Sequence, residues 1–234
     1  MTDLQGARVL VTGASGGLGS LLAGGMAARG AVVAVSGRDE QRLRALEVEA
    51  VAHLPADLRQ PGAPDALVGS AVEALGGLDV LVHAAGVVAF GPAAEVDDDL
   101  LDDLLLLHYL APVRLLRAAV PHLRTSAAER GGAAAVMLSA VVAEQPVAGM
   151  AAYSAAKAAL TAFDAAVAKE LRRDRVRVLD VRPPHTETGL AGRPVAGEAP
   201  RMPEGLPPQD VVDRILRAVV DDERDLPSSA FRAG

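Results

Sequence analysis

The stretch VTGASGGLGS occupies residues 11–20 and joins an apolar, strand-like segment to an apolar, helix-like one. Glycines at positions 13, 17 and 19 allow a tight turn and let backbone N–H groups approach a pyrophosphate at the helix N-terminus. A glycine pattern alone is weak evidence, because an ordinary strand-to-helix turn can carry one. The position of this one between a strand and a helix is informative, and it indicates a dinucleotide-binding β–α unit.

The same alternation of strand-like and helix-like segments extends along the whole chain. The expected strands cover residues 7–13, 31–37, 49–54, 78–86, 133–140 and 175–184. The expected helices cover residues 18–29, 39–47, 64–75, 100–123, 152–172 and 209–222, with a kink at Pro112. Near-continuous apolar strands that alternate with helices indicate a parallel sheet covered on both faces. The sequence therefore predicts a single α/β domain over residues 1–234, with a Rossmann-like doubly wound parallel sheet flanked by helices.

The composition argues against several classes of protein. Half of the residues are hydrophobic, which excludes a disordered chain, and a net charge of -7 without a basic tail argues against a nucleic-acid partner. The sequence has no cysteine for disulfides or thiolate metal sites, and His53, His122 and His185 lack metal-ligand spacing. The N-terminus does not read as a signal peptide, and no apolar run reaches the ~18 residues of a membrane span. We therefore expect a cytoplasmic protein without a metal or a membrane partner.

A pair of residues suited to acid–base chemistry stands at the start of the helix expected over residues 152–172. Tyr153 precedes Lys157 by four residues, so both side chains lie on one helix face. A phenol has a pKa of about 10, and a nearby ammonium is expected to lower that pKa. Tyr153 can then exchange a proton with a carbonyl or an alcohol. The alternative is a solvated surface pair, but the chain has only two lysines and two tyrosines, so chance placement is a poor explanation.

The glycine loop is the first of five motifs that appear in order along the chain. It reads T-G-x-x-x-G-x-G, and it is followed by ADL at 56–58, HAAG at 83–86, YSAAK at 153–157 and RPPHTETGL at 182–190. At this spacing the set resembles the short-chain dehydrogenase/reductase family, over nearly the whole chain. The resemblance implies an NAD(P)(H)-dependent oxidoreductase that interconverts a carbonyl and an alcohol by hydride transfer. Residues 186–208, rich in glycine and proline, are expected to form a loop that covers the small-molecule substrate.

The resemblance also implies roles for individual residues. Tyr153 is the acid–base residue, and Lys157 lowers its pKa and binds the cofactor ribose. His108 stands where the family carries an asparagine that connects the lysine to solvent through water, so it either partly replaces that asparagine or packs in a helix interface. The residues implied in cofactor binding are Thr12, Gly13, Ser15, Gly17, Leu18, Gly19, Arg38, Asp57, Leu58, Ala84, Ala85, Gly86, Tyr153, Lys157, Pro183 and Thr188. A homodimer or homotetramer built on the helices at 100–123 and 152–172 is expected.

The end of the second expected strand bears on the choice of cofactor. NAD-binding sheets usually place an acid there for the ribose 2′-hydroxyl, whereas this chain has Ser36, followed two residues later by Arg38. With no acid to repel it, a 2′-phosphate can pair with Arg38, so NADP(H) is expected to be preferred over NAD(H). The alternative is that Arg38 is a solvated residue that opens a charged helix. Asp57 also has two interpretations: the adenine-side acid of the family, or the cap of a capping box completed by Gln60.

The chain departs from the resembled family at the position of the catalytic serine. Counting thirteen residues back from Tyr153 reaches Ala140, while Ser139 stands one residue early and is expected to point to the other face of the strand. Ser139 is therefore interpreted as structural, unless a one-residue shift at the strand end rescues it. Loss of such a donor typically costs about 10²- to 10³-fold in rate. Two hypotheses follow: an oxidoreductase with reduced activity, and a dinucleotide-binding sensor or partner subunit that is catalytically weak or inactive.

Overall fold

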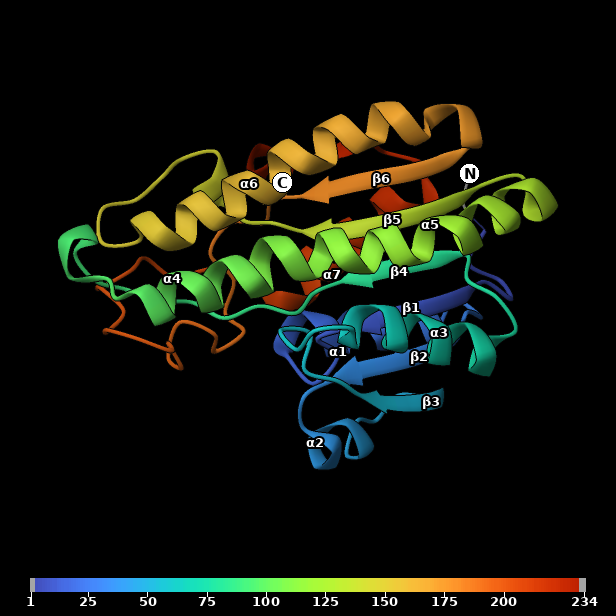
Figure 1. Cartoon of the computed structure of the whole chain (residues 1–234), viewed down its shortest axis with the longest axis horizontal. Coiled ribbons are helices and arrows are strands. Elements are labelled where there is room, and N and C mark those ends of the chain that lie inside the picture. Colours follow the sequence, from blue (N-terminus) through green and yellow to red (C-terminus); the bar gives the residue numbers. More distant parts are fainter. Residues whose placement is uncertain (1–2, 232–234) are drawn as a thin grey trace.

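Seven parallel strands form one sheet in the order β3-β2-β1-β4-β5-β6-β7 in the computed structural model, which describes residues 3–231 (Figure 1). The strands are β1 Arg8–Thr12, β2 Val32–Gly37, β3 Ala50–Pro55, β4 Val80–His83, β5 Ala133–Leu138, β6 Val176–Val181 and β7 Asp225–Leu226. Every residue of β4, β5 and β6 is buried, as apolar strands are when helices cover both faces of the sheet. The predicted doubly wound α/β fold is therefore confirmed.

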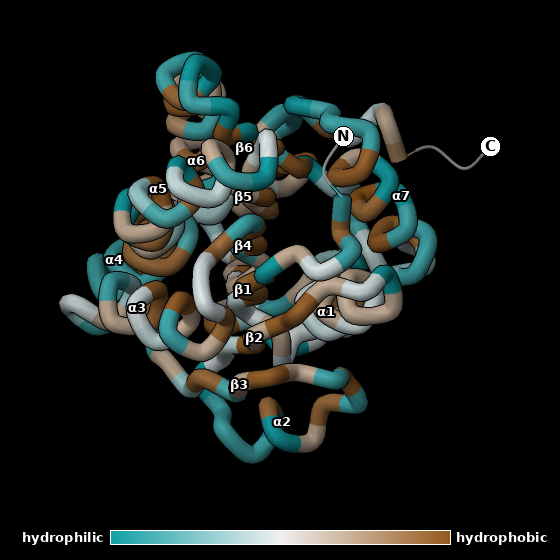
Figure 2. The backbone as a smooth tube through the Cα atoms, turned by 90° about the vertical axis from the view of Figure 1, so that its right-hand side faces the viewer, coloured by the Kyte–Doolittle hydropathy of each residue, from teal (hydrophilic) through white to brown (hydrophobic). Residues whose placement is uncertain are grey.

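Helices cover both faces of this sheet. They are α1 Gly17–Ala27, α2 Glu40–Arg44, α3 Ala63–Leu75, α4 Asp98–Leu105, α5 Ala111–Arg130, α6 Ala151–Glu170 and α7 Pro208–Val220. One face packs against α3, α5 and α6, and the other packs against α1 and α7 (Figure 2). Fully buried leucines such as Leu22, Leu115 and Leu216 join the helices to the sheet, and each stabilises the fold by about 2 kcal/mol.

Two of the expected strands end three residues earlier than predicted. The strand expected over residues 78–86 ends at His83, although the Ala84 N–H still donates to the Thr12 carbonyl at 3.1 Å. The strand expected over residues 175–184 ends at Val181, shortly before Pro183 and Pro184. Proline has no N–H to donate to a neighbouring strand, so the sheet cannot continue through this pair.

The longest helical segment carries its irregularity just before Pro112. Between α4 and α5, residues Leu106–Leu110 form a π turn in which the Ala111 N–H donates to the Leu106 carbonyl. Pro112 has no N–H for the preceding turn, and the π turn accommodates this loss. By length and composition the whole helix, Asp98–Arg130, could cross a membrane, contrary to the sequence prediction. Many of its apolar residues, among them Leu115 and Leu123, are buried in the core beside the sheet, whereas Leu101 and Leu105 are exposed.

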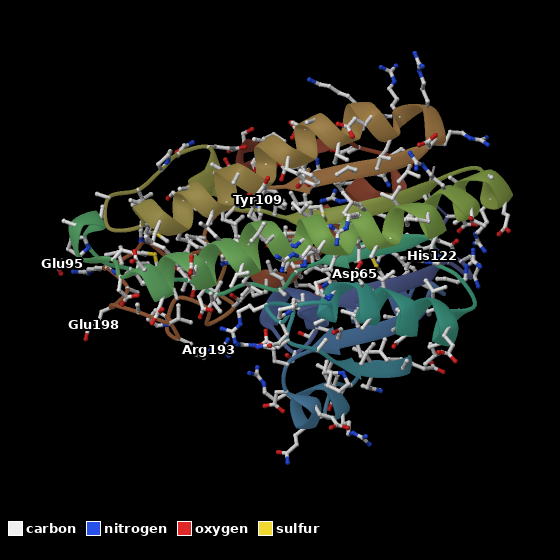
Figure 3. All side chains as sticks on the ribbon, viewed as in Figure 1. Asp65, Glu95, Tyr109, His122, Arg193 and Glu198 are labelled. Atoms are coloured by element: carbon white, nitrogen blue, oxygen red, sulfur yellow. The ribbon has the colours of Figure 1, made fainter. Side chains whose placement is uncertain are left out.

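The chain between β6 and α7 forms the predicted loop, which contains no helix. Two isolated bridges hold it, Thr186 to Leu206 and Ala89 to Ala196. Figure 3 shows Glu198 of this loop at the end of the molecule that also carries Glu95 before α4, while Arg193 lies nearer the middle and donates to the Gly189 carbonyl of the same loop.

The strand order reverses beside β1, since β2 lies on one side of it and β4 on the other. Thr12, the last residue of β1, is aligned with Ser36 of β2 and with His83 of β4. The strands are parallel, so their carboxyl ends meet at one edge of the sheet. Ligands of open α/β sheets bind at such a switch point, and the predicted motifs all lie at this edge.

Candidate active site

The glycine loop between β1 and α1 forms a narrow cradle. A Cβ atom on Gly13, whose φ is +71°, would lie 2.6 Å from the Ala84 carbonyl carbon, and one on Gly19 would lie 2.7 Å from the Gly13 carbonyl carbon. Both positions therefore require glycine. Gly16 caps α1 without a side-chain hydrogen bond, and Leu18 anchors the helix start on the core. The first N–H groups of α1 remain for a ligand, which is the arrangement that binds a diphosphate.

Distant segments close this cradle. A Cβ atom on Gly17 would lie 2.7 Å from Thr188 Cβ, so the segment after β6 touches the glycine loop. Pro183 accepts a hydrogen bond from the Val141 N–H at 3.0 Å, which ties the end of β6 to the end of β5. Thr12 is fully buried, and its Oγ1 lies 2.9 Å from His83 Nδ1. The Thr12 side chain therefore joins β1 to β4.

A basic residue that the sequence interpretation missed lies beside Ser15. The Arg42 guanidinium on α2 donates to the Ser15 carbonyl of the glycine loop at 2.7 Å. Arg38 is exposed at the end of β2, and Asp39 caps α2 by accepting from the Arg42 N–H. Arg42 lies in the helix expected over residues 39–47, which begins directly after Arg38, and this closeness in sequence was the signal available. The Arg42 guanidinium therefore borders the glycine loop, while the charge of Arg38 contributes to the lowered pKa of Asp57.

The capping box predicted at Asp57 is wrong. Residues 57–62 form a turn, and α3 begins at Ala63 after Gly62, whose φ is +77°. Asp57 instead binds Arg59 through both carboxylate oxygens, at 3.0 and 2.8 Å, and this pairing holds the pKa of Asp57 below its usual value. The Leu58 side chain is buried in the core under α3, so only its backbone remains for an adenine ring.

Tyr153 and Lys157 are buried together on one face of α6, at 7% and 5% exposure. Lys157 Nζ donates to the Leu138 carbonyl at the end of β5 at 2.8 Å. Burial lowers the pKa of Lys157 to about 8, against an opposing effect of Asp180 and Asp164. Burial also raises the pKa of Tyr153, so the expected lowering by Lys157 is not found. The Lys157 ammonium is hydrogen-bonded to the Leu138 carbonyl. The Tyr153 phenol lies among apolar groups, which disfavour its ionised form.

Ser139 has the structural role that the sequence analysis assigned to it. Its Oγ donates to the Lys157 carbonyl at 3.0 Å and accepts from Thr161 Oγ1 at 2.9 Å. Both contacts tie α6 to the end of β5, away from a substrate. Ala140 packs against the apolar cluster that contains Tyr153.

His108 lies beside Tyr153 and close to Lys157. Its ring meets the Tyr153 ring edge to face, with centroids 5.2 Å apart, and its Nε2 lies 2.9 Å from the Val87 carbonyl. A Cβ atom on Gly86 would lie 3.0 Å from His108 Cε1 and 4.0 Å from Lys157 Nζ, so these residues crowd one point. Within residues 3–231, His108 Nδ1 and His83 Nε2 are buried without a hydrogen-bond partner. Burial holds the pKa of His108 well below its usual value, so the ring is neutral.

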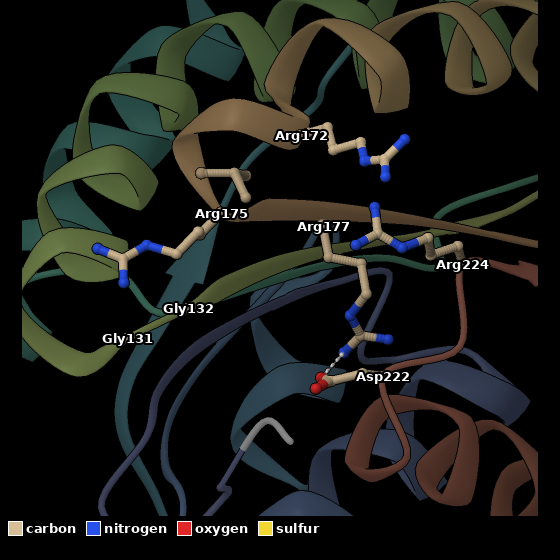
Figure 4. Close-up of a pocket in the computed structure, with 8 residues that line it drawn as sticks. Gly131, Gly132, Arg172, Arg175, Arg177, Asp222 and Arg224 are labelled. Carbon is tan, nitrogen blue, oxygen red and sulfur yellow. Dashed lines mark ion pairs between the residues drawn. The ribbon is translucent and has the colours of Figure 1, made fainter.

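Other candidate sites lie elsewhere. Figure 4 shows a cavity of about 170 Å³ lined by Arg172, Arg175, Arg177 and Arg224, which begins at the amino end of β6, opposite the glycine loop. His185 interacts with Glu187 inside its own loop, at 3.2 Å. No cluster of metal ligands occurs among the described residues. The candidate active site is therefore the group of residues at the carboxyl edge of the sheet.

Comparisons with known proteins agree with this arrangement. The profile of the family described as short chain dehydrogenase matches residues 7–198. An Anopheles gambiae protein named dehydrogenase/reductase SDR family protein 7-like is 30% identical over 241 residues, 95% of this chain and 75% of that protein. An uncharacterized oxidoreductase of Methylorubrum extorquens is 30% identical over 240 residues, 96% of this chain and 94% of that protein. A solved Burkholderia cenocepacia short chain dehydrogenase in complex with NADP is 28% identical, with a TM-score of 0.83 and coverage of 99% and 100%. The chain therefore belongs to the short-chain dehydrogenase family.

Proposed function

We propose that the protein is an NADP(H)-preferring oxidoreductase that reduces the carbonyl group of a small-molecule substrate to an alcohol. One observation carries the proposal: α6 buries Tyr153 and Lys157 side by side at the edge of the sheet where the glycine cradle lies. Family membership supports the reaction class, and the NADP complex of the Burkholderia relative supports the cofactor class.

The residues at this edge fit a nicotinamide dinucleotide. The N–H groups at the start of α1 would hold the diphosphate, and Arg38 with Arg42 would bind a 2′-phosphate. The turn at Asp57 would border the adenine. The remaining contacts would come from Ala84, Ala85, Gly86, Pro183, Thr188 and Lys157. When bound, the cofactor supplies a hydride to the carbonyl carbon.

The protonation state of Tyr153 favours reduction over oxidation. Burial raises the pKa of its phenol, so the hydroxyl keeps its proton at neutral pH. A protonated phenol can give that proton to a carbonyl oxygen as the carbon is reduced, whereas alcohol oxidation needs the phenolate. Lys157 lies on the same helix face, and its ammonium, held by the Leu138 carbonyl, would lie one helical turn from the phenolate that forms after the transfer.

His108 supplies a route for returning the proton. If Nε2 donates to the Val87 carbonyl, Nδ1 is an acceptor beside Lys157 and Gly86. A water bound there would connect the lysine to the solvent through a neutral ring. Replacing His108 by alanine should lower turnover and alter its pH profile, and replacement by asparagine should retain more of both. If alanine changes neither, His108 is a packing residue.

A second function is favoured by the methyl group at Ala140. Without a hydroxyl there, the substrate oxygen would lack one donor, and the protein would act as a dinucleotide sensor or partner subunit with little turnover.

We further propose a cytoplasmic homodimer or homotetramer. The exposed leucines Leu101 and Leu105 on α4 support an interface, as do the exposed alanines Ala155, Ala162 and Ala166 on α6.

Titration with NADPH and with NADH, followed by the fluorescence of the bound cofactor, tests the proposal without a known substrate. NADPH should bind about 10- to 100-fold more tightly, because charge-assisted hydrogen bonds contribute about 1.5–3 kcal/mol. Arg38→Ala and Arg42→Ala should each reduce this ratio, while the control Arg44→Ala, which removes a pair with Glu40, should not. Absence of binding by both cofactors would refute the oxidoreductase and the sensor alike.

A carbonyl screen with NADPH then separates the two functions. Tyr153→Phe should abolish any turnover found, since phenylalanine has no proton to give. The chain offers a matched control in Tyr109→Phe, because Tyr109 is the only other tyrosine and packs on Phe163. Cofactor binding without turnover on any carbonyl, in both the wild type and Ala140→Ser, would favour the sensor.

A further inference from the structure

Asp164 is buried in an unusual way for a carboxyl group. It follows Lys157 by seven residues on α6, which places both on one helix face, and it is 1% exposed. Neither of its oxygens has a hydrogen-bond partner among residues 3–231. An ionised carboxylate in such surroundings is costly, so burial favours the neutral acid.

Asp180 of β6 approaches Asp164 from the sheet. β6 alternates its side chains, and Val176 and Val178 lie in the core on the α6 side, so Asp180 shares their face. One Asp180 oxygen binds the Arg182 guanidinium, while the other has no partner among the described residues. After burial, Asp180 is the next cause that raises the pKa of Asp164, to about 9. Burial raises the pKa of Asp180 as well, but the Arg182 guanidinium bound to it opposes that rise, so Asp180 is the ionised member of the pair and Asp164 the protonated one.

The same two carboxyl groups are the acidic residues that face Lys157. The other titratable groups around the ammonium are Tyr153 of α6, His83 of β4 and His108 of the π turn, and none of them is an anion here. Asp180 and Asp164 oppose the effect of burial on Lys157, Asp180 more strongly.

Two hydroxyl groups lie between Asp180 and the backbone of Lys157. Thr161 lies close enough to Asp180 to affect its pKa, and its hydroxyl donates to Ser139 Oγ. Ser139 in turn donates to the Lys157 carbonyl. Arg182 faces Asp180 from its other side, and it also binds Glu144 and Asp225.

We propose that Asp180 and Asp164 are a positioning pair for Lys157: Asp180 is the carboxylate that keeps the buried ammonium charged, and Asp164 is its neutral, protonated neighbour. A second negative charge beside Asp180 would be repelled, so the pair shares one proton. The inference rests on the proposed function in one respect only: that a charged Lys157 beside Tyr153 matters for turnover. The charge state itself can be measured in the absence of cofactor and substrate.

The chain makes that measurement direct, because Lys157 and Lys169 are its only lysines. Protein labelled with ¹³C at the lysine ε carbon should give two signals, and Lys169→Arg identifies the one from Lys157. The Lys157 signal should titrate near pH 8 in the wild type. Asp180→Asn should lower its midpoint by about one pH unit, the usual effect of removing a close opposite charge. Asp164→Asn should move the midpoint by less than about 0.3 unit, since an amide replaces a neutral acid.

Asp225→Asn is the matched control, because it removes another carboxylate from Arg182 and does not face Lys157. An unchanged Lys157 midpoint in Asp180→Asn, or an equal shift in Asp225→Asn, would overturn the proposal. If Asp180→Asn does not fold, ¹³C-labelled aspartate in the wild type decides the matter. One carboxyl should titrate near pH 9 and be absent from Asp164→Asn; titration of every aspartate below pH 6 would refute the pair. A lysine shift without cofactor binding would refute the proposed function and leave the pair standing.

Discussion

Replacing Asp164 by asparagine should change the pH dependence of stability in a predictable direction. The pKa of Asp164 is raised to about 9 in the folded protein by burial and by Asp180, while an aspartate in an unfolded chain has a pKa of about 3.9. Between these values the folded state keeps a proton that the unfolded state releases. The free energy of unfolding contributed by this group is thus complete below pH 4 and falls as the pH rises towards 9, by about 1.4 kcal/mol per pH unit.

Between pH 5 and pH 7.5 this slope amounts to about 3 kcal/mol, an upper bound because the buried pair can relax. Asparagine has nearly the same shape and does not titrate, so Asp164→Asn should gain about this much stability relative to the wild type over that range. Urea unfolding followed by circular dichroism at pH 5, 6, 7 and 7.5 measures the difference, in which all other titrating groups cancel. Asp102→Asn, at an exposed position of α4, is the control. A difference between Asp164→Asn and wild type that stays constant over this range would show that Asp164 is ionised in the folded protein.

Three further predictions concern single positions. Ala140→Ser should raise turnover of any carbonyl substrate by about 10²-fold if the missing hydroxyl is what limits the reaction, and steady-state kinetics with NADPH would show it; no gain means that another group already holds the substrate oxygen. Gly13→Ala should weaken NADPH binding by more than about 10-fold and lower the melting temperature, because a Cβ atom would clash with the Ala84 carbonyl carbon; equal binding would disprove the close approach. Asp79→Ala should cost about 3 kcal/mol in urea unfolding, because it leaves the Arg8 guanidinium without its two-point partner; a loss below about 1 kcal/mol would contradict that account.

Much of the site was predictable because its motifs act over short distances. The turn at Gly13, the start of α1 and the shared face of Tyr153 and Lys157 depend on residues within one or two helical turns of each other. The structure places these features, and the contact of Thr188 with Gly17, at the edge where the parallel strands end. The role of Ser139 was also predictable, since side chains alternate along a strand.

Two other expectations were wrong, one because a proline and a glycine prevent a helix from starting, and one because a side chain binds a segment distant in the sequence. The capping box at Asp57 required a helix to start there. Pro61 and the positive φ of Gly62 delay the start of α3 to Ala63, and the Asp57 carboxylate binds Arg59 instead. The lowered pKa expected for Tyr153 required an ammonium close to the phenol. Lys157 instead reaches the Leu138 carbonyl, and burial has the larger effect.

The sequence by itself determined the alternation of the first six strands with helices, the glycine turn and the spacing of Tyr153 and Lys157, because periodicity and the steric needs of glycine act between near neighbours; β7 was not predicted. Only the tertiary structure decided that Arg42 donates to the Ser15 carbonyl and that Asp164 lies near enough to Asp180 and Lys157 for their charges to affect its pKa. It also decided which buried groups keep their protons. The physical reason is that desolvation and the field of distant charges depend on the packing of segments far apart in the chain, and these set the protonation states on which the proposed chemistry depends.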